Sequence, residues 1–192
     1  MNLLLVGAGG HARPVTEAAE LMGHQVVGYA APEKSTWCSA PRIADGEPWP
    51  ADADGCVIGI GGGDVVSLMR RGKIAKSYSK NGATPFICHP AATLSAYAFV
   101  SKGAVVLAGA VVNAAAEIGA FAIINTGAIV EHDARIAEGA HVAPGAIVLG
   151  GAIVGKFSMI ASGAVVLPGA EVPSGTLVPA LSYFGGRIKS CK

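Results

Sequence analysis

The chain has 192 residues, a formal net charge of +1 and only 14% charged residues. So few charges argue against a basic surface for nucleic acid and against a polybasic segment for a membrane surface. The apolar runs are interrupted by glycines and are shorter than the roughly 18 residues that a membrane span requires.

The first thirty residues predict the order strand, glycine turn, helix, strand. Residues 3–6 are a short apolar run, residues 13–22 have helical apolar spacing with Pro14 near their start, and residues 25–29 are a second apolar run. This order opens a doubly wound α/β unit, in which amides at the helix N-terminus can bind phosphate. We therefore expect a Rossmann-like nucleotide-binding domain over residues 1–88.

The turn after the first strand contains a loose form of the dinucleotide fingerprint, with Gly7, Gly9 and Ala12 at the required spacing. An acid that binds the ribose should end the second strand, but Ala30 and Ala31 stand there. The domain is also too short for a full dinucleotide fold. One nucleotide diphosphate is therefore a better candidate ligand than NAD.

A second glycine cluster follows the third expected strand. Residues 31–54 are loop-like, residues 56–60 form the strand, and Gly61 and Gly62 lead into a helix that should run to about residue 80. Glycines after two strands of one parallel sheet indicate two walls of the same crevice. Residues 84–87 should form the last strand before the repeat begins.

From Leu94 to Val178 an aliphatic residue stands at every sixth position, and a small residue follows four positions later. The aliphatic positions are Leu94, Val100, Val106, Val112, Ile118, Ile124, Val130, Ile136, Val142, Val148, Val154, Ile160, Val166, Val172 and Val178. This register is typical of a hexapeptide β-helix, whose stacked rungs bury the aliphatic side chains in one core. We expect this all-β domain over residues 89–181, followed by a tail over residues 182–192.

The residue before each aliphatic position should point outward, because neighbouring side chains of a strand alternate between faces. These outward positions are Phe99, Val105, Val111, Glu117, Ile123, Ile129, Arg135, His141, Ile147, Ile153, Met159, Val165, Glu171 and Leu177. Most of them are apolar, and a soluble monomer rarely exposes so broad an apolar surface. We therefore expect a partner subunit to cover it.

Two histidines lie in the repeat, and neither occupies a core position. His132 stands at a corner between Glu131 and Asp133, whereas His141 is on an outward strand position. Three hexapeptides form one triangular coil, so His132 stacks against Gly150, one coil further along, and His141 is half a coil away. Since one subunit cannot easily bring both histidines to one substrate, we expect an active site at a subunit interface.

A histidine beside a carboxylate suits general base catalysis, because its pKa lies near neutrality and the acid stabilises the imidazolium. The repeat contains no cysteine, so direct attack of the acceptor on a thioester is simpler than a covalent acyl-cysteine route. Gly150 and Gly151 offer backbone amides close to His132 for a developing oxyanion.

The four cysteines have no metal-ligand spacing, and the first ten residues have no charged region ahead of their apolar run. These features favour reduced thiols in a cytoplasmic protein with no signal peptide and no metal site.

Three stretches, residues 7–11, 89–90 and 124–133, together resemble the bacterial nucleotide-amino-sugar N-acetyltransferases. This family includes enzymes of the perosamine and bacillosamine pathways and is related to the sialic acid O-acetyltransferases. The resemblance covers nearly the whole chain. It implies a left-handed β-helix, a homotrimer with intersubunit active sites, acetyl-CoA as donor and a nucleotide-linked amino sugar as acceptor in polysaccharide or glycan synthesis.

The resemblance also implies roles for residues around the corner histidine. His132 would take a proton from the sugar amine, and Asp133 would orient it. Asn125 and His141 match positions that line the site, and Gly150 matches the amide donor to the acetyl carbonyl.

In the N-terminal domain, Gly9, Gly10 and His11 match the phosphate-side turn of the nucleotide pocket. Relatives usually carry an Asp pair after the second strand that helps to hold the nucleotide, where this chain has Ala30 and Ala31.

The expected activity is acetyl-CoA-dependent N-acetylation of a nucleotide-linked 4-amino-4,6-dideoxy sugar. O-acetylation of a sugar would use the same base and stays open, as does a non-catalytic scaffold that only binds a nucleotide. A zinc hydratase on the same scaffold would need three histidine ligands, which two histidines in the repeat do not provide.

Overall fold

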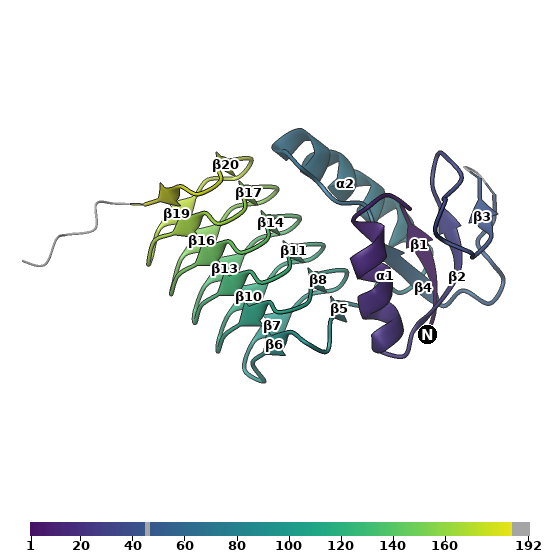
Figure 1. Ribbon diagram of the computed structural model, residues 1–192, viewed down its shortest axis with the longest axis horizontal. Coiled ribbons are helices and arrows are strands. Elements are labelled where there is room, and N and C mark those ends of the chain that lie inside the picture. The colour runs from purple at the N-terminus through teal and green to yellow at the C-terminus, as the bar shows by residue number, and fades with distance from the viewer. Residues whose placement is uncertain (45–46, 186–192) are drawn as a thin grey trace, which may run out of the picture.

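The computed structural model describes residues 1–44 and 47–185 (Figure 1). An α/β part lies at one end of the molecule, a parallel β-solenoid forms the rest, and one helix lies alongside the solenoid. Within the described ranges, no helix is long and apolar enough to cross a membrane. Most of the tail expected over residues 182–192 lies outside the described residues.

The N-terminal part is a four-stranded parallel sheet with strand order β3-β2-β1-β4. Its elements are β1 (Asn2–Val6), α1 (Ala12–Leu21), β2 (Gln25–Ala30), β3 (Arg42–Ile43), β4 (Gly55–Ile58) and α2 (Val65–Tyr78). Side chains that alternate along β1 pack in two clusters, Leu3 and Leu5 with α1 and Leu4 with Ala75 of α2. The two helices therefore cover opposite faces of the sheet, which explains why β4 and residues 3–6 of β1 are buried and contain no charged or strongly polar side chain.

Two expectations for this part were wrong. The segment 31–54 contains a short strand, β3, which adds to the sheet edge beside β2. The strand expected over residues 84–87 is β5 (Ile87–Cys88), which pairs with Val105 and Val106 of the solenoid, and only a single bridge between Gly55 and Ala83 extends the N-terminal sheet. Residue 87 is one coil before residue 105, so the 18-residue spacing already governs its pairing.

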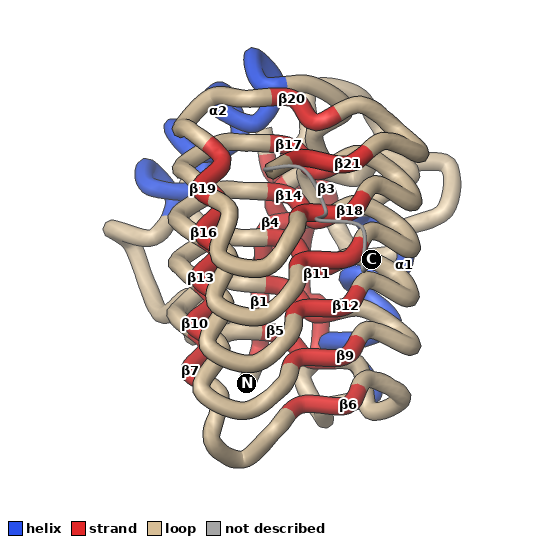
Figure 2. Tube along the Cα trace, turned by 90° about the vertical axis from the view of Figure 1, so that its left-hand side faces the viewer, coloured by secondary structure: helices blue, strands red, loops and turns tan. Residues whose placement is uncertain are grey.

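The solenoid confirms the six-residue register. Its further strands are β6 (Thr93–Leu94), β7 (Phe99–Val100), β8 (Val105–Val106), β9 (Val111–Val112), β10 (Glu117–Ile118), β11 (Ile123–Ile124), β12 (Ile129–Val130), β13 (Arg135–Ile136), β14 (His141–Val142), β15 (Ile147–Val148), β16 (Ile153–Val154), β17 (Met159–Ile160), β18 (Val165–Val166), β19 (Glu171–Val172), β20 (Leu177–Val178) and β21 (Tyr183–Phe184). Strands β5 to β18 each pair in parallel with the strand 18 residues further on, as Ile123 does with His141. Three ladders result, visible in Figure 2, and they form a β-solenoid of the left-handed type.

The aliphatic positions of the repeat form one continuous core. From Val106 to Val178 they are at most 2% exposed, and they pack with the small residues four positions later. At the open first coil, Leu94 and Val100 are only partly buried. Burial of each rung against the next makes the solenoid a single stack.

The apolar exterior is narrower than the sequence suggests. Val105 and Ile123, both outward-facing, are 1% and 0% exposed, and on the ladder that contains β8, β11 and β14 the chain's own N-terminal part packs on Val105 and contacts His141. The next ladder, from β6 to β21, keeps a half-buried row that we name the apolar stripe. It consists of Val111, Ile129, Ile147 and Val165.

Candidate active site

His132 lies on a solenoid corner between β12 and β13. Its Nδ1 is 2.8 Å from Oδ2 of Asp133, and both side chains are about two-thirds exposed, at 66% and 65%. In the neutral ring Nδ1–H donates to the carboxylate, which leaves the lone pair of Nε2 free. A ring fixed in this tautomer can accept a proton at Nε2.

The charge of the corner supports the same role. The hydrogen bond that His132 donates to Asp133 is the main cause that raises the pKa of His132 above its ordinary value of 6.5, and the nearby charges of Asp133 and Glu131 act in the same direction. A raised pKa makes His132 a stronger base.

Gly150 lies one coil from His132. A Cβ atom added at Gly150 would be 2.8 Å from both Cε1 and Nε2 of His132, so a glycine is required for the imidazole to occupy its place. The amide of Gly151 donates to the carbonyl of His132 at 3.0 Å, which commits that amide to the fold. Of the two glycines, Gly150 is the better source of an amide for substrate.

His141 is placed differently from His132. It is 5% exposed, its Nδ1 is 2.9 Å from the carbonyl oxygen of Gly62, and its Nε2 is 3.0 Å from Nδ2 of Asn125. Since a carbonyl only accepts, Nδ1–H donates to Gly62 and Nε2 accepts from Asn125. Burial is the main cause that lowers the pKa of His141.

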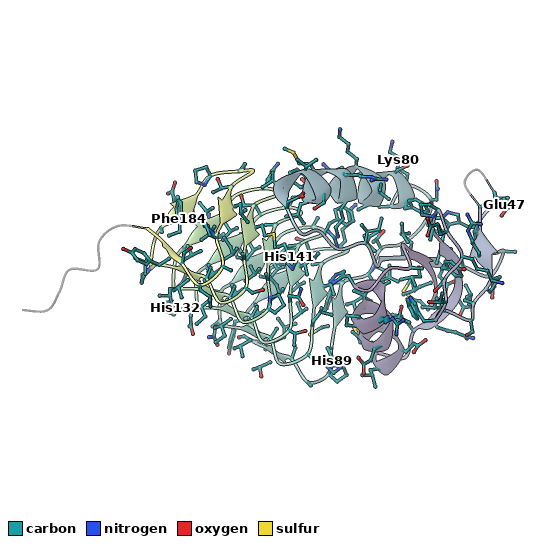
Figure 3. The ribbon with its side chains drawn as sticks, turned by 45° about the horizontal axis from the view of Figure 1, so that its top comes forward. Glu47, Lys80, His89, His132, His141 and Phe184 are labelled. Carbon is teal, nitrogen blue, oxygen red and sulfur yellow. The ribbon has the colours of Figure 1, made fainter. Side chains whose placement is uncertain are left out.

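Both nitrogens of His141 are therefore engaged, and the bond from Nδ1 joins the solenoid to the loop after β4. Figure 3 shows His132 and His141 at separate places on the solenoid. Within one chain, the structure brings Asp133 and Gly150 to His132, and it brings Asn125, Gly62 and His11 to His141; the rings of His11 and His141 are 6.5 Å apart.

A cleft of about 870 Å³ opens at the carboxyl ends of β1, β2 and β4. Gly7, Gly9, Gly10, His11 and Gly61 line it, but Gly62 does not. The rest of its wall is Val6, Ala8, Ala30, Ala31, Pro32, Glu33, Lys34, Ser35, Thr36, Gly59, Ile60, Ser67, Arg70, Arg71, Ile74 and Tyr78. This volume lies within the range of ligand pockets, about 300–1,000 Å³.

The two helices that begin beside the cleft differ in whether a carboxylate caps their N-terminus. α2 has a capping box, in which the side chain of Asp64 accepts from the amide of Ser67, so a carboxylate already balances its N-terminus. α1 has no side-chain cap and no acid in its first turn. Gly9 and Gly10 precede α1, and nothing within 4 Å would meet a Cβ at either position. An anion is therefore best accommodated at α1.

Several residues of the cleft could not be identified from sequence patterns. Lys34, Ser35 and Thr36 come from a segment read only as loop, which is held by the Trp37 indole donating to the carbonyl of Ala8 at 2.8 Å. Arg71 is an interior residue of α2 and is 0% exposed. The run of two arginines, in a helix that also has Lys73 and Lys76, was the available signal.

Among the described residues, no group of three or more His, Cys, Asp or Glu side chains is placed to hold a metal ion.

The fold, which is shared with acetyltransferases of known structure, defines the class as an acyl-CoA-dependent acetyltransferase. No protein-family model matches the sequence, and no curated protein sequence matches it significantly. Among solved structures, a variant of perosamine N-acetyltransferase from Caulobacter crescentus, in complex with CoA and GDP-perosamine, is similar with a TM-score of 0.86 and 28% identity. That match covers 96% of this chain and 89% of the other.

The acetyltransferase domain of PglB from Neisseria gonorrhoeae is also similar, with a TM-score of 0.86, 27% identity and coverage of 98% and 93%. A second structure of that domain contains acetyl coenzyme A. WeeI from Acinetobacter baumannii, at 18% identity and a TM-score of 0.65, shares the fold. The comparisons confirm the resemblance inferred from the sequence, and the neighbours bind the expected cosubstrate.

Proposed function

We propose that the chain is an acetyl-CoA-dependent N-acetyltransferase that acts on the amino group of a nucleotide-linked 4-amino-4,6-dideoxy sugar. The observation that carries the proposal is the corner formed by His132, Asp133 and Gly150, on a fold shared with enzymes that bind coenzyme A and GDP-perosamine.

In the proposed reaction the sugar amine attacks the thioester carbonyl of acetyl-CoA. Nε2 of His132 takes a proton from the attacking nitrogen, and Asp133 stabilises the resulting imidazolium through Nδ1. The amide of Gly150 donates to the oxyanion of the tetrahedral intermediate. As the C–S bond breaks, the imidazolium returns the proton to the thiolate of CoA, and the amide product forms.

The nucleotide is proposed to occupy the cleft of the N-terminal part, which thereby acts as a Rossmann-like nucleotide domain. Three cationic side chains, Lys34, Arg70 and Arg71, and one carboxylate, Glu33, line this cleft. The excess of positive charge suits a diphosphate, and the uncapped N-terminus of α1 at Gly9, Gly10 and His11 provides amides for it. Ala30 and Ala31 leave no acid at the end of β2 to contact the nucleotide.

A homotrimer is proposed because the apolar stripe borders the corner that carries His132. Ile129 of the stripe lies on β12, three residues before His132. A second subunit packed on the stripe would place its own residues beside the imidazole and bury the exposed dyad.

The test is His132→Ala, assayed by release of CoA thiol with GDP-perosamine and with UDP-linked 4-amino-4,6-dideoxy sugars. Loss of a general base should lower kcat/KM by about 10²–10⁴-fold, while size-exclusion chromatography shows an unchanged oligomer. His24→Ala, at the turn after α1, is the control and should retain activity. Near-normal turnover by His132→Ala would refute the assignment. A hydroxyl sugar acetylated faster than its amino counterpart would establish O-acetylation instead.

A further inference from the structure

Arg71 on α2 is a buried cation beside the nucleotide cleft. Its side chain is 0% exposed. Nε donates to the carbonyl of Ile60 at 2.6 Å and Nη1 donates to the carbonyl of Phe121, so the guanidinium joins the end of β4 to a solenoid corner. Nη2 is buried and has no hydrogen-bond partner.

The charge of Arg71 is not balanced by a carboxylate. Its two partners are neutral carbonyls, and within residues 1–44 and 47–185 no Asp or Glu forms an ion pair with it. Burial alone lowers the pKa of Arg71 to about 10, so the group still carries its charge at neutral pH. An unpaired buried charge costs stability, and such groups concentrate at functional sites.

Arg71 and His11 form part of the same cleft wall. Arg71 lines the cleft together with His11, whose buried Nε2 also has no partner. The positive charge of Arg71 contributes to the low pKa of His11, about 4, after burial as the main cause. Two donor-capable nitrogens thus lie unpaired where the glycine turn before α1 meets α2.

We propose that Arg71 is the specificity-determining cation for the diphosphate of the bound nucleotide: an anionic ligand in the cleft supplies the countercharge that the protein omits. This inference rests on the proposed function. Because Arg71 is shielded from water, its field acts on the ligand through a medium of low dielectric constant and is weakly screened by salt. Arg70, exposed in the same cleft, is screened by salt.

The experiment measures affinity for GDP and UDP, and for guanosine and uridine, by isothermal titration calorimetry at low and high salt. Arg71→Gln keeps donors near the two carbonyls but removes the charge, and Arg71→Lys keeps the charge. Arg70→Gln is the matched control in the same cleft. Thermal unfolding of each variant without ligand verifies that it is folded.

For the nucleotide that the wild type binds, Arg71→Gln should weaken diphosphate binding by roughly tenfold to a hundredfold at both salt concentrations. The affinity for the uncharged nucleoside should change less than about twofold, and Arg71→Lys, which keeps a cation but not the forked donor geometry, should bind the diphosphate more tightly than Arg71→Gln. The effect of Arg70→Gln should be smaller and should disappear at high salt.

Equal loss of nucleoside and diphosphate binding in Arg71→Gln would show a merely structural clamp and overturn the proposal, as would wild-type affinity for the diphosphate. If Arg71→Gln does not fold, Arg71→Lys decides: retained diphosphate binding supports the proposal, and a folded lysine variant that loses it refutes it. A wild-type protein that binds neither diphosphate would contradict the proposed function itself.

Discussion

Replacing Gly150 with alanine tests the geometry of the proposed base most directly. The new Cβ would lie 2.8 Å from Cε1 and Nε2 of His132. Non-bonded carbons ordinarily stay 3.5–4.0 Å apart, so the imidazole must retreat by roughly 0.7 Å. Misplacement of a catalytic group by about 1 Å can cost about 10²-fold. We expect kcat/KM to fall by about tenfold to a hundredfold, equivalent to about 1.4–2.7 kcal/mol of transition-state stabilisation.

The assay for Gly150→Ala is thiol release from acetyl-CoA under second-order conditions, together with urea unfolding. The fold should tolerate the change, because Ala114 occupies the equivalent corner one coil before His132 and its carbonyl accepts from the amide of Asp133. Gly63→Ala is the control, since a Cβ at Gly63 meets nothing within 4 Å. An unchanged kcat/KM in Gly150→Ala would show that the ring of His132 is not where proton transfer occurs.

Three further changes address the charge, the assembly and the buried histidine. Asp133→Asn removes the main cause of the raised pKa of His132, so the acidic limb of the pH–kcat/KM profile should move to lower pH and the plateau should fall. An acidic limb that does not move would show that the His132–Asp133 pair is not the catalytic base. Ile147→Asp puts a carboxylate in the apolar stripe and should yield monomers by light scattering with loss of activity, whereas Ile153→Asp, on the neighbouring ladder, should not. The pKa of His11 falls from 6.5 to about 4 in the fold, so the contribution of neutral His11 to the free energy of unfolding is complete above pH 6.5 and is lost as the pH falls toward 4. In urea titrations, the loss of stability between pH 6.5 and pH 4 should be smaller in His11→Gln than in the wild type by up to about 3 kcal/mol, and an equal loss would contradict this reasoning.

The solenoid was predictable because its long-range pairing repeats a local count. Residues 18 apart, such as Ile123 and His141, pair at every coil, so the register of one hexapeptide fixes the ladder, the core and the corner neighbours. The same arithmetic placed Gly150 beside His132, and the structure confirms that contact. Contacts within one strand–turn–helix unit, such as those of β1 with α1, were predictable because the two elements are close in sequence.

The contacts between the N-terminal part and the solenoid follow no sequence repeat, and they were not predicted from the sequence. Val105 and Ile123 were predicted to be exposed apolar residues because nothing local indicates that they are buried, Val105 in a cluster with residues of α1. His141 likewise read as an outward residue that lines a site, whereas Gly62 and Asn125 engage both of its nitrogens. Arg71 donates to the carbonyl of Phe121, 50 residues further along the chain, and no spacing rule predicts this contact.

The solenoid corners show where function departs from the demands of the fold. At most corners a glycine adopts positive φ, but Asp133 has φ of 59° and Ala115, one coil earlier, has φ of 59° as well. Left-handed backbone costs a non-glycine residue up to about 1–2 kcal/mol, and less for Asp. We therefore expect Asp133→Gly to raise the free energy of unfolding by roughly 0.5–1 kcal/mol while sharply lowering kcat/KM, because the hydrogen bond that fixes His132 is lost. Ala115→Gly should give a similar gain in stability with unchanged activity. If Asp133→Gly destabilises the protein, or if it keeps wild-type activity, the carboxylate is at this corner for a structural reason and the dyad is not the source of catalysis.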